Sequence, residues 1–222
     1  MIRLVPLLAL SLSLAACAGG QRPEYMRAGT GGEMAYARGE RAQRDGDVAT
    51  AMQAYRCSAA FGRGYEVAWH SLGVLALDTA DAPGTSPSDT EAFRAEGFEA
   101  LETAANAGWA ASQAELAIRH HRMGHTAEAA RWSAIYRTNN RDQALGLTRL
   151  PQTTSDAIAA NASDAERAAA VEAAADFFPR PLDTAQAGPE CRDLTSPMRR
   201  EREINLQDVI QPGVGTSRPT GQ

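Results

Sequence analysis

Small residues recur at matched positions along the middle of this chain, and this recurrence constrains the fold more than any other feature of the sequence. The stretch from Gly64 to Gly73, GYEVAWHSLG, and the stretch from Gly108 to Ala117, GWAASQAELA, begin 44 residues apart. Each has glycine first, a small residue four positions later, leucine eight positions later, and glycine or alanine nine positions later. Because a small side chain lets another backbone approach closely, the recurrence predicts helices that cross at these residues.

The same pattern, followed along the chain, predicts three helix pairs. Each first helix carries a small residue at the crossing, and each returning helix carries another. These residues are Gly39, Gly73 and Ala117 in the first helices, and Ala51, Gly97 and Ala129 in the returning helices. The expected ranges are 33–45 with 47–61, 65–79 with 89–106, and 110–123 with 127–139.

Capping and turn residues support these boundaries. Gly46, Gly64, Gly108 and Gly124 fall between the expected helices, where a positive φ is often needed. Asp47 and Thr126 are expected to cap the helices that follow them. The stretches SDTE, Ser88 to Glu91, and SDAE, Ser163 to Glu166, match the capping box and predict a helix start at each.

The stretches AYRCSAAFGRGYEVAWHSLG and LETAANAGWAASQAELA resemble the tetratricopeptide superfamily, and more closely its Sel-one-like subclass. The likeness lies in the Ala-Ala-x-x-Gly turn and the Leu-Gly pair, and it covers roughly residues 35–137. It implies an all-α fold: a short right-handed solenoid of about three helix-hairpin repeats within residues 33–148, with a capping helix within residues 149–178.

In related repeats, the first helices form a concave face that captures peptides or helices. By the repeat frame, nine residues are expected to line this partner-binding groove. They are Tyr36, Glu40, Arg44, His70, Val74, Asp78, Ile118, His121 and Arg122. Each could equally be ordinary solvated surface.

The N-terminus has the pattern of a secretory signal. Arg3 precedes an apolar run that is too short for a permanent membrane span, and the run ends in LAAC at Cys17. This ending resembles the lipobox of bacterial lipoproteins, which implies removal of residues 1–16 and acylation of Cys17, with palmitate among the acyl chains. Residues 17–32 are then expected to be a lipidated flexible tether. Ala18 favours the outer membrane by the enterobacterial sorting rule, and we expect the periplasmic face over the cell surface.

The C-terminal region, residues 179–222, contains six prolines and few large apolar residues. Such a segment buries little apolar surface, so we expect it to be irregular or disordered. Two cysteines besides Cys17 are present, Cys57 and Cys191. In an oxidising compartment they could form a disulfide. Alternatively, Cys57 is a small buried residue and Cys191 a free thiol; the sequence leaves both open.

Charge and motifs narrow the possible chemistry. The formal net charge of −5 argues against a nucleic-acid partner, because phosphates require a basic face. No phosphate loop, nucleophile elbow or paired His-Glu motif is present, so we expect neither an enzyme nor a cofactor nor a small-molecule substrate. His121 and His125 have the four-residue spacing of a metal pair, but Gly124 is expected to end the helix between them, so we expect no metal site.

The sequence therefore predicts a lipid-anchored scaffold or adaptor of the bacterial envelope that binds a protein or peptide, as in the assembly of an envelope, pilus or secretion complex. Two alternatives are an enzyme or enzyme subunit that acts on cell-wall material, and a purely structural surface lipoprotein.

Overall fold

The computed structural model describes residues 30–196. Within this range the regular structure is helical, apart from one isolated antiparallel bridge between Gly62 and Thr184, so the described part of the chain is all-α as predicted. None of its helices combines the length and the apolar character that a membrane span requires. The expected signal peptide, Cys17 and residues 197–222 lie outside the described residues.

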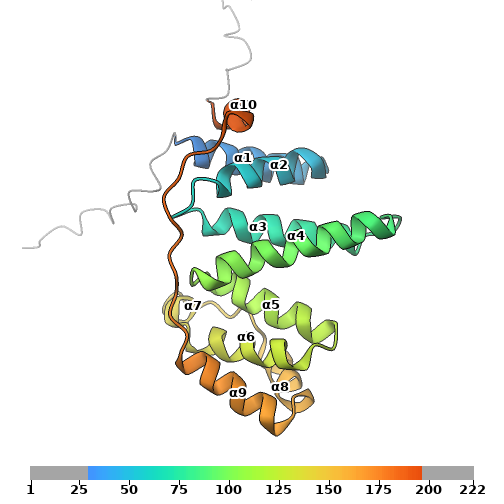
Figure 1. Ribbon diagram of the computed structural model, residues 1–222, viewed down its shortest axis with the longest axis vertical. Helices are drawn as coiled ribbons and strands as arrows, with labels where there is room; N and C mark the ends of the chain where they lie inside the picture. Colours follow the sequence, from blue (N-terminus) through green and yellow to red (C-terminus); the bar gives the residue numbers. More distant parts are fainter. Residues whose placement is uncertain (1–29, 197–222) are drawn as a thin grey trace, which may run out of the picture.

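The helices of the first 109 described residues pack in successive pairs, α1 on α2, α3 on α4 and α5 on α6. Figure 1 shows these pairs layered along the long axis, with α3 and α4 projecting beyond the others. Their bounds lie within two residues of the predicted ranges. They are α1 Gly31–Arg44, α2 Val48–Ala59, α3 Glu66–Ala80, α4 Pro87–Asn106, α5 Ala110–Arg122 and α6 Thr126–Thr138.

Small residues are buried at the helix crossings, as predicted. A Cβ atom added to Gly73 would lie 2.8 Å from the carbonyl oxygen of Gly97, and one added to Gly97 would lie 2.6 Å from Leu77. In the first pair, a Cβ on Gly39 would lie 2.6 Å from the ring of Tyr55. The alanines at the remaining crossings are at most 1% exposed; these are Ala51, Ala117 and Ala129.

Two predicted caps are confirmed and two are wrong. Asp47 accepts a hydrogen bond from the backbone of α2, and Ser163 forms a full capping box with Glu166. The cap of α4 is Ser86 and not Ser88, because Pro87 occupies the first turn, where its missing N–H is not needed. Thr126 does not cap α6; its hydroxyl donates to Glu166 of α9 at 2.7 Å, which lowers the pKa of that carboxyl.

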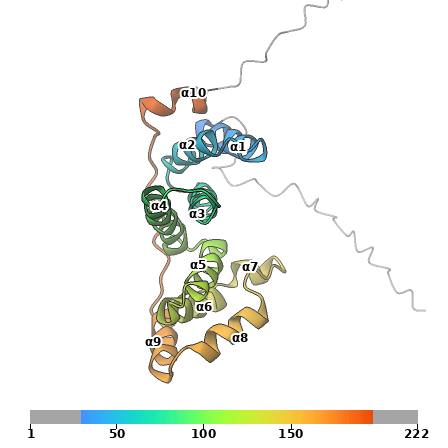
Figure 2. The same cartoon turned by 90° about the vertical axis from the view of Figure 1, so that its right-hand side faces the viewer.

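The region expected to hold one capping helix holds two, α8 Gln152–Asn161 and α9 Asp164–Ala175, preceded by the short helix α7 Asn140–Ala144. Both α8 and α9 pack on α6. Ile158 of α8 and Ala170 of α9 belong to the same hydrophobic cluster as Trp132 of α6, which is 1% exposed. The last pair is therefore covered on the side away from the other pairs (Figure 2).

Residues 179–196, which we name the strap, correct the prediction of a disordered tail for that part of the chain. The strap runs along the edge of the layered pairs back to the first pair (Figure 1) and ends in a 3₁₀ turn, Pro189–Cys191, and α10, Arg192–Thr195. Hydrogen bonds to its backbone and one small apolar cluster around Cys191 fix the strap, and neither leaves a hydrophobic period in the sequence, which is why composition alone indicated disorder. Cys191 forms a disulfide with Cys57 of α2, so the bridged alternative is the one observed. The predicted tether, residues 17–32, extends two residues too far, since α1 begins at Gly31 after the cap Thr30.

We predict that Gly97→Ala lowers the free energy of unfolding by about 1–3 kcal/mol, because the added methyl group overpacks the crossing with Leu77 and Gly73. Alanine has the higher intrinsic helix propensity by about 1 kcal/mol, so propensity alone would give the opposite sign. Urea unfolding measures the change. An increase in stability would contradict a tight crossing, and Ala92→Gly at an exposed position of α4 calibrates the propensity effect.

Candidate functional site

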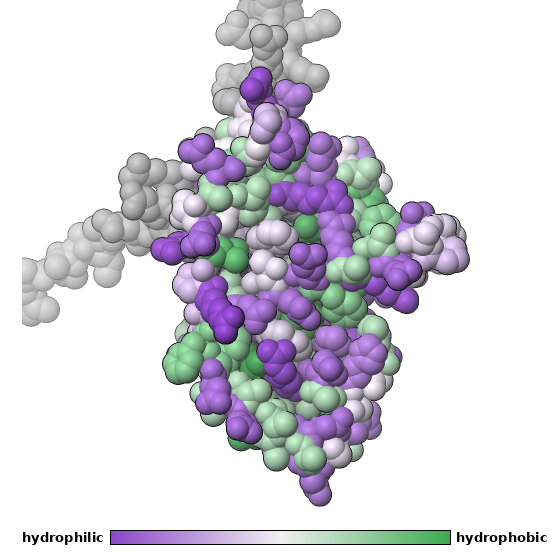
Figure 3. Space-filling model, in the orientation of Figure 1, coloured by the Kyte–Doolittle hydropathy of each residue, from purple (hydrophilic) through white to green (hydrophobic). Residues whose placement is uncertain are grey.

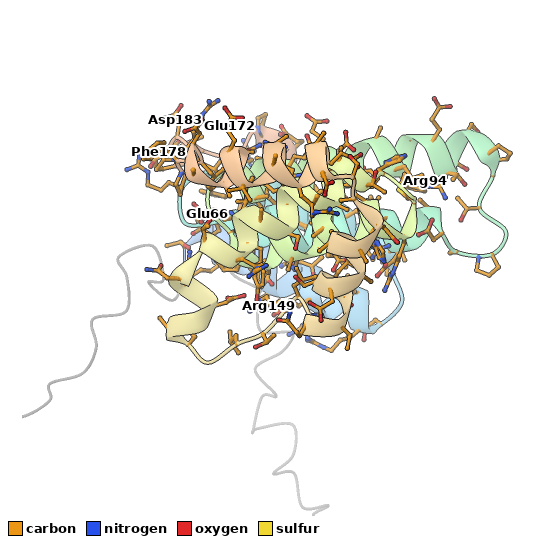
Figure 4. All side chains as sticks on the ribbon, turned by 90° about the horizontal axis from the view of Figure 1, so that it is seen from below. Glu66, Arg94, Arg149, Glu172, Phe178 and Asp183 are labelled. Carbon is orange, nitrogen blue, oxygen red and sulfur yellow. A yellow bond between two sulfur atoms is a disulfide. The ribbon has the colours of Figure 1, made fainter. Side chains whose placement is uncertain are left out.

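The predicted groove lies on the side of the first helices. Figure 2 shows α1 and α3 on one side of the molecule, α2, α4 and the strap on the other, and α7 and α8 projecting on the side of α1 and α3. In Figure 4, Arg149, between α7 and α8, likewise lies on the opposite side of the molecule from Phe178 and Asp183 of the strap edge. The strap therefore leaves the face of the first helices uncovered.

At the upper end of this face, α1, α2 and α3 enclose a hollow of about 360 Å³. It contains three of the nine predicted groove residues and three that the prediction missed. Its lining is Tyr36, Glu40, Gln43, Arg44, Tyr55 and Ser71. We name it the tyrosine hollow.

The tyrosines of this hollow are held by neighbouring polar groups. The hydroxyl of Tyr36 lies 3.2 Å from the Ser71 hydroxyl of the next pair, and the Tyr55 hydroxyl donates to Gln43 at 2.6 Å. The two rings lie 5.5 Å apart. Burial raises the pKa of Tyr36 and raises that of Tyr55 to about 12, so both hydroxyls stay protonated at neutral pH, and the proton of Tyr55 is used by Gln43. The side chains of Glu40 and Arg44 are exposed at the rim.

In the middle of the face, His70 of α3 contacts α5. Its Nδ1 lies 3.0 Å from the Ser112 hydroxyl. Burial lowers the pKa of His70, with smaller opposing and reinforcing effects from Glu115 and Arg149. A Ser–His contact is the core of many hydrolase sites, but Ser112 is 0% exposed, so a substrate carbonyl could not reach its oxygen. The contact joins two helices and provides no accessible nucleophile.

A second contact between α3 and α5 is an ion-pair cluster that uses one predicted residue, Asp78. The Arg119 guanidinium lies 2.5 Å from Asp78 of α3 and 2.7 Å from Glu115 of its own helix. Its side chain is only 11% exposed, whereas that of Asp78 is 58% exposed. Asp78 therefore joins α3 to α5 through Arg119. The repeat frame did not predict Arg119, because it selects positions one by one and does not show which side chains of a neighbouring helix reach them.

The remaining predicted positions differ in exposure. Val74 and Ile118 are half-buried and pack against the large hydrophobic cluster that includes Leu150 and Ile158. They therefore lie at the edge of the hydrophobic core. His121 is half-buried and Arg122 is exposed at the end of α5. The structure thus brings together Tyr36, Glu40 and Arg44 in one hollow and distributes the others along the face.

A second hollow of about 560 Å³, which was not predicted, lies beside the projecting end of α4. Phe98 and the exposed Met123 line it together with Pro87 and Arg94. In Figure 4, Arg94 stands toward this projecting end. Figure 3 shows polar and apolar residues intermixed over the face drawn in Figure 1.

The histidines near the end of α5 are arranged differently from the pair considered in the sequence. His120, not His121, approaches His125, with 3.3 Å between their Nδ1 atoms, and it stacks on Phe98. Burial lowers the pKa of His120. Within residues 30–196, no group of three or more His, Cys, Asp or Glu residues is placed to hold a metal ion.

No protein-family model, curated protein or solved structure matches this chain.

We predict that the stability of the protein falls as the pH drops below about 6.5, in part through His70. The folded-state pKa of His70 lies below its unfolded value, so the unfolded chain binds the proton more readily and acid favours unfolding. His120 acts in the same direction. Denaturant midpoints at about pH 7.5 and pH 5 should therefore differ less for His70→Gln than for the unmodified protein. Ser112→Ala, which keeps the histidine buried, should retain the larger difference, and equal differences in all three would contradict the assignment.

Proposed function

We propose that this protein is a lipid-anchored scaffold of the bacterial envelope that binds a protein or peptide through the face of its first helices. The N-terminal signal pattern and the LAAC ending support the anchor at Cys17. The disulfide between Cys57 and Cys191 supports an oxidising compartment such as the periplasm, since cytosolic proteins rarely keep such bonds. By the sorting rule, Ala18 supports the outer membrane.

The architecture proposed for this scaffold is a short right-handed solenoid of tetratricopeptide type, close to the Sel-one-like subclass. Small residues buried at the crossings of successive pairs support it, because they occur at the positions that the repeat frame marks. The two helices α8 and α9 cover the last pair, as a solenoid end requires for solubility.

The observation that carries the binding proposal is the tyrosine hollow. It offers the protonated hydroxyl of the half-buried Tyr36 inside and both a negative and a positive side chain, Glu40 and Arg44, at its rim. Tyrosine and arginine are the residue types that most often dominate protein interfaces. An amphipathic peptide, with a polar residue for the Tyr36 hydroxyl and charges for the rim, suits this lining.

Capture from crosslinked envelopes tests the binding face. We expect Arg44→Glu to lower recovery of a defined partner by roughly fivefold or more, the effect of losing about 1 kcal/mol of binding free energy. Arg180→Glu makes the same charge change on the strap edge and should leave recovery unchanged. A chain that ends at residue 196 keeps the strap and should bind like the full chain. Recovery of abundant porins alone, from every variant, would support the purely structural alternative.

The anchor has a separate test. We expect Cys17→Ala to abolish incorporation of labelled palmitate and to release the protein from the membrane fraction, because stable anchoring needs more than one acyl chain. Cys191→Ala removes a different cysteine and should leave labelling intact. Palmitate that persists in the Cys17 variant would contradict the lipobox assignment.

A further inference from the structure

The strap joins the two ends of the layered pairs and touches the connections between them. It leaves α9, which packs on α6. Its Arg180 N–H donates to the carbonyl of Asn106, in the turn between α4 and α5, at 2.8 Å. Pro179 lies against Gly108 of the same turn. The lower part of the strap is therefore fixed to the connection between the second and third pairs.

Higher up, the strap pairs with the connection between α2 and α3. The Arg63 N–H donates to the carbonyl of Asp183 at 3.2 Å, and the Ala185 N–H donates to that of Phe61 at 3.1 Å. Between them, a Cβ on Gly62 would overlap the Asp183 carbonyl oxygen, and its φ of +74° also favours glycine. The strap thus approaches this connection as closely as backbone atoms allow.

At its end the strap is fixed to the first pair in two ways. The guanidinium of Arg38 in α1 donates to the carbonyls of Asp193 and Ser196. Cys191 is bonded to Cys57 of α2, and these cysteines are 4% and 2% exposed. The two cysteines are thus buried, and Ala35 of α1, Ala187 and Leu194 pack around them.

This connection changes how the first pair can open. In a linear array each pair is stabilised by its neighbours, so an end pair with a single neighbour opens most easily. Here α1 and α2 have one neighbouring pair, which begins with α3. The disulfide closes a loop of 134 residues through the other pairs, so opening of the first pair must also strip the strap from Gly62 and Asn106.

We propose that the Cys57–Cys191 disulfide and the strap form a redox-dependent clasp, which couples the first helix pair to the rest when oxidised and lets it open separately when reduced. The reductant is a dithiol, either a small molecule or a thioredoxin-like protein. It gives two electrons and two protons, the S–S bond breaks into the thiols of Cys57 and Cys191, and the dithiol becomes a disulfide. The clasp does not depend on the proposed partner or on the anchor.

Hydrogen exchange followed by mass spectrometry tests the clasp on the full chain, in detergent, with and without dithiothreitol. We expect the amides of α1 and α2 to exchange roughly 30- to 1,000-fold faster after reduction, the range that corresponds to the usual contribution of a disulfide. The amides of α5 and α6 should change far less. Cys57→Ser combined with Cys191→Ser should reproduce the reduced pattern without dithiothreitol.

Other outcomes would overturn the clasp. Equal acceleration over α1 to α6 would mean that the disulfide adds only to global stability, and no acceleration would mean that the strap does not restrain the first pair. Loss of the helical circular dichroism signal in the double serine variant would also overturn it, because the proposal requires the helices to persist. Gly62→Ala with the disulfide intact is the matched variant: because it weakens one attachment of the strap and keeps the covalent bond, it should speed exchange in residues 61–65 and speed that of α1 and α2 far less than reduction does.

Discussion

The close approach of α3 and α4 at Gly73 and Gly97 is the contact on which the rest of the arrangement depends. Here two backbones meet with no side chain between them, and Leu77 and Leu101 fill the space beside the contact. The pair then presents α3 to α2 above it and α4 to α5 below it, so its internal spacing sets the position of both neighbouring pairs. The contacts from Tyr36 to Ser71 and from His70 to Ser112 form because α3 lies where this crossing places it.

The strap adds a second kind of constraint, because it acts between distant parts of the chain. The crossings relate each helix to its neighbour in sequence, whereas the disulfide relates α2 to a residue 134 positions later. Local contacts can form early, since they close short loops. The strap contacts connections that belong to different helix pairs, so its position depends on those pairs being in register.

The helices could be predicted because their signals are local. Small residues at matched spacing marked the crossings, and the Ser163–Glu166 capping box marked the start of α9. The strap could not be predicted, because it has no hydrophobic period and its partners, such as Phe61 and Asn106, are distant backbone groups. The cap at Ser86 was missed because Pro87 competes with the SDTE pattern for the helix start.

The candidate site was predictable to the same extent. Position in the first helices indicated which residues face the groove, and this found Tyr36, Glu40 and Arg44. It could not show that Asp78 is engaged by Arg119, or that Ile118 borders the core, because both depend on neighbouring helices.

The face of the first helices is therefore uneven. Its lower part is occupied by contacts between helices, and its upper part keeps exposed charge above two buried hydroxyls. That upper part lies between α1, α2 and α3, where the first pair meets the second, so whatever loosens the first pair also changes the shape of the tyrosine hollow. The binding proposed for the hollow and the clasp proposed for the strap therefore involve the same junction.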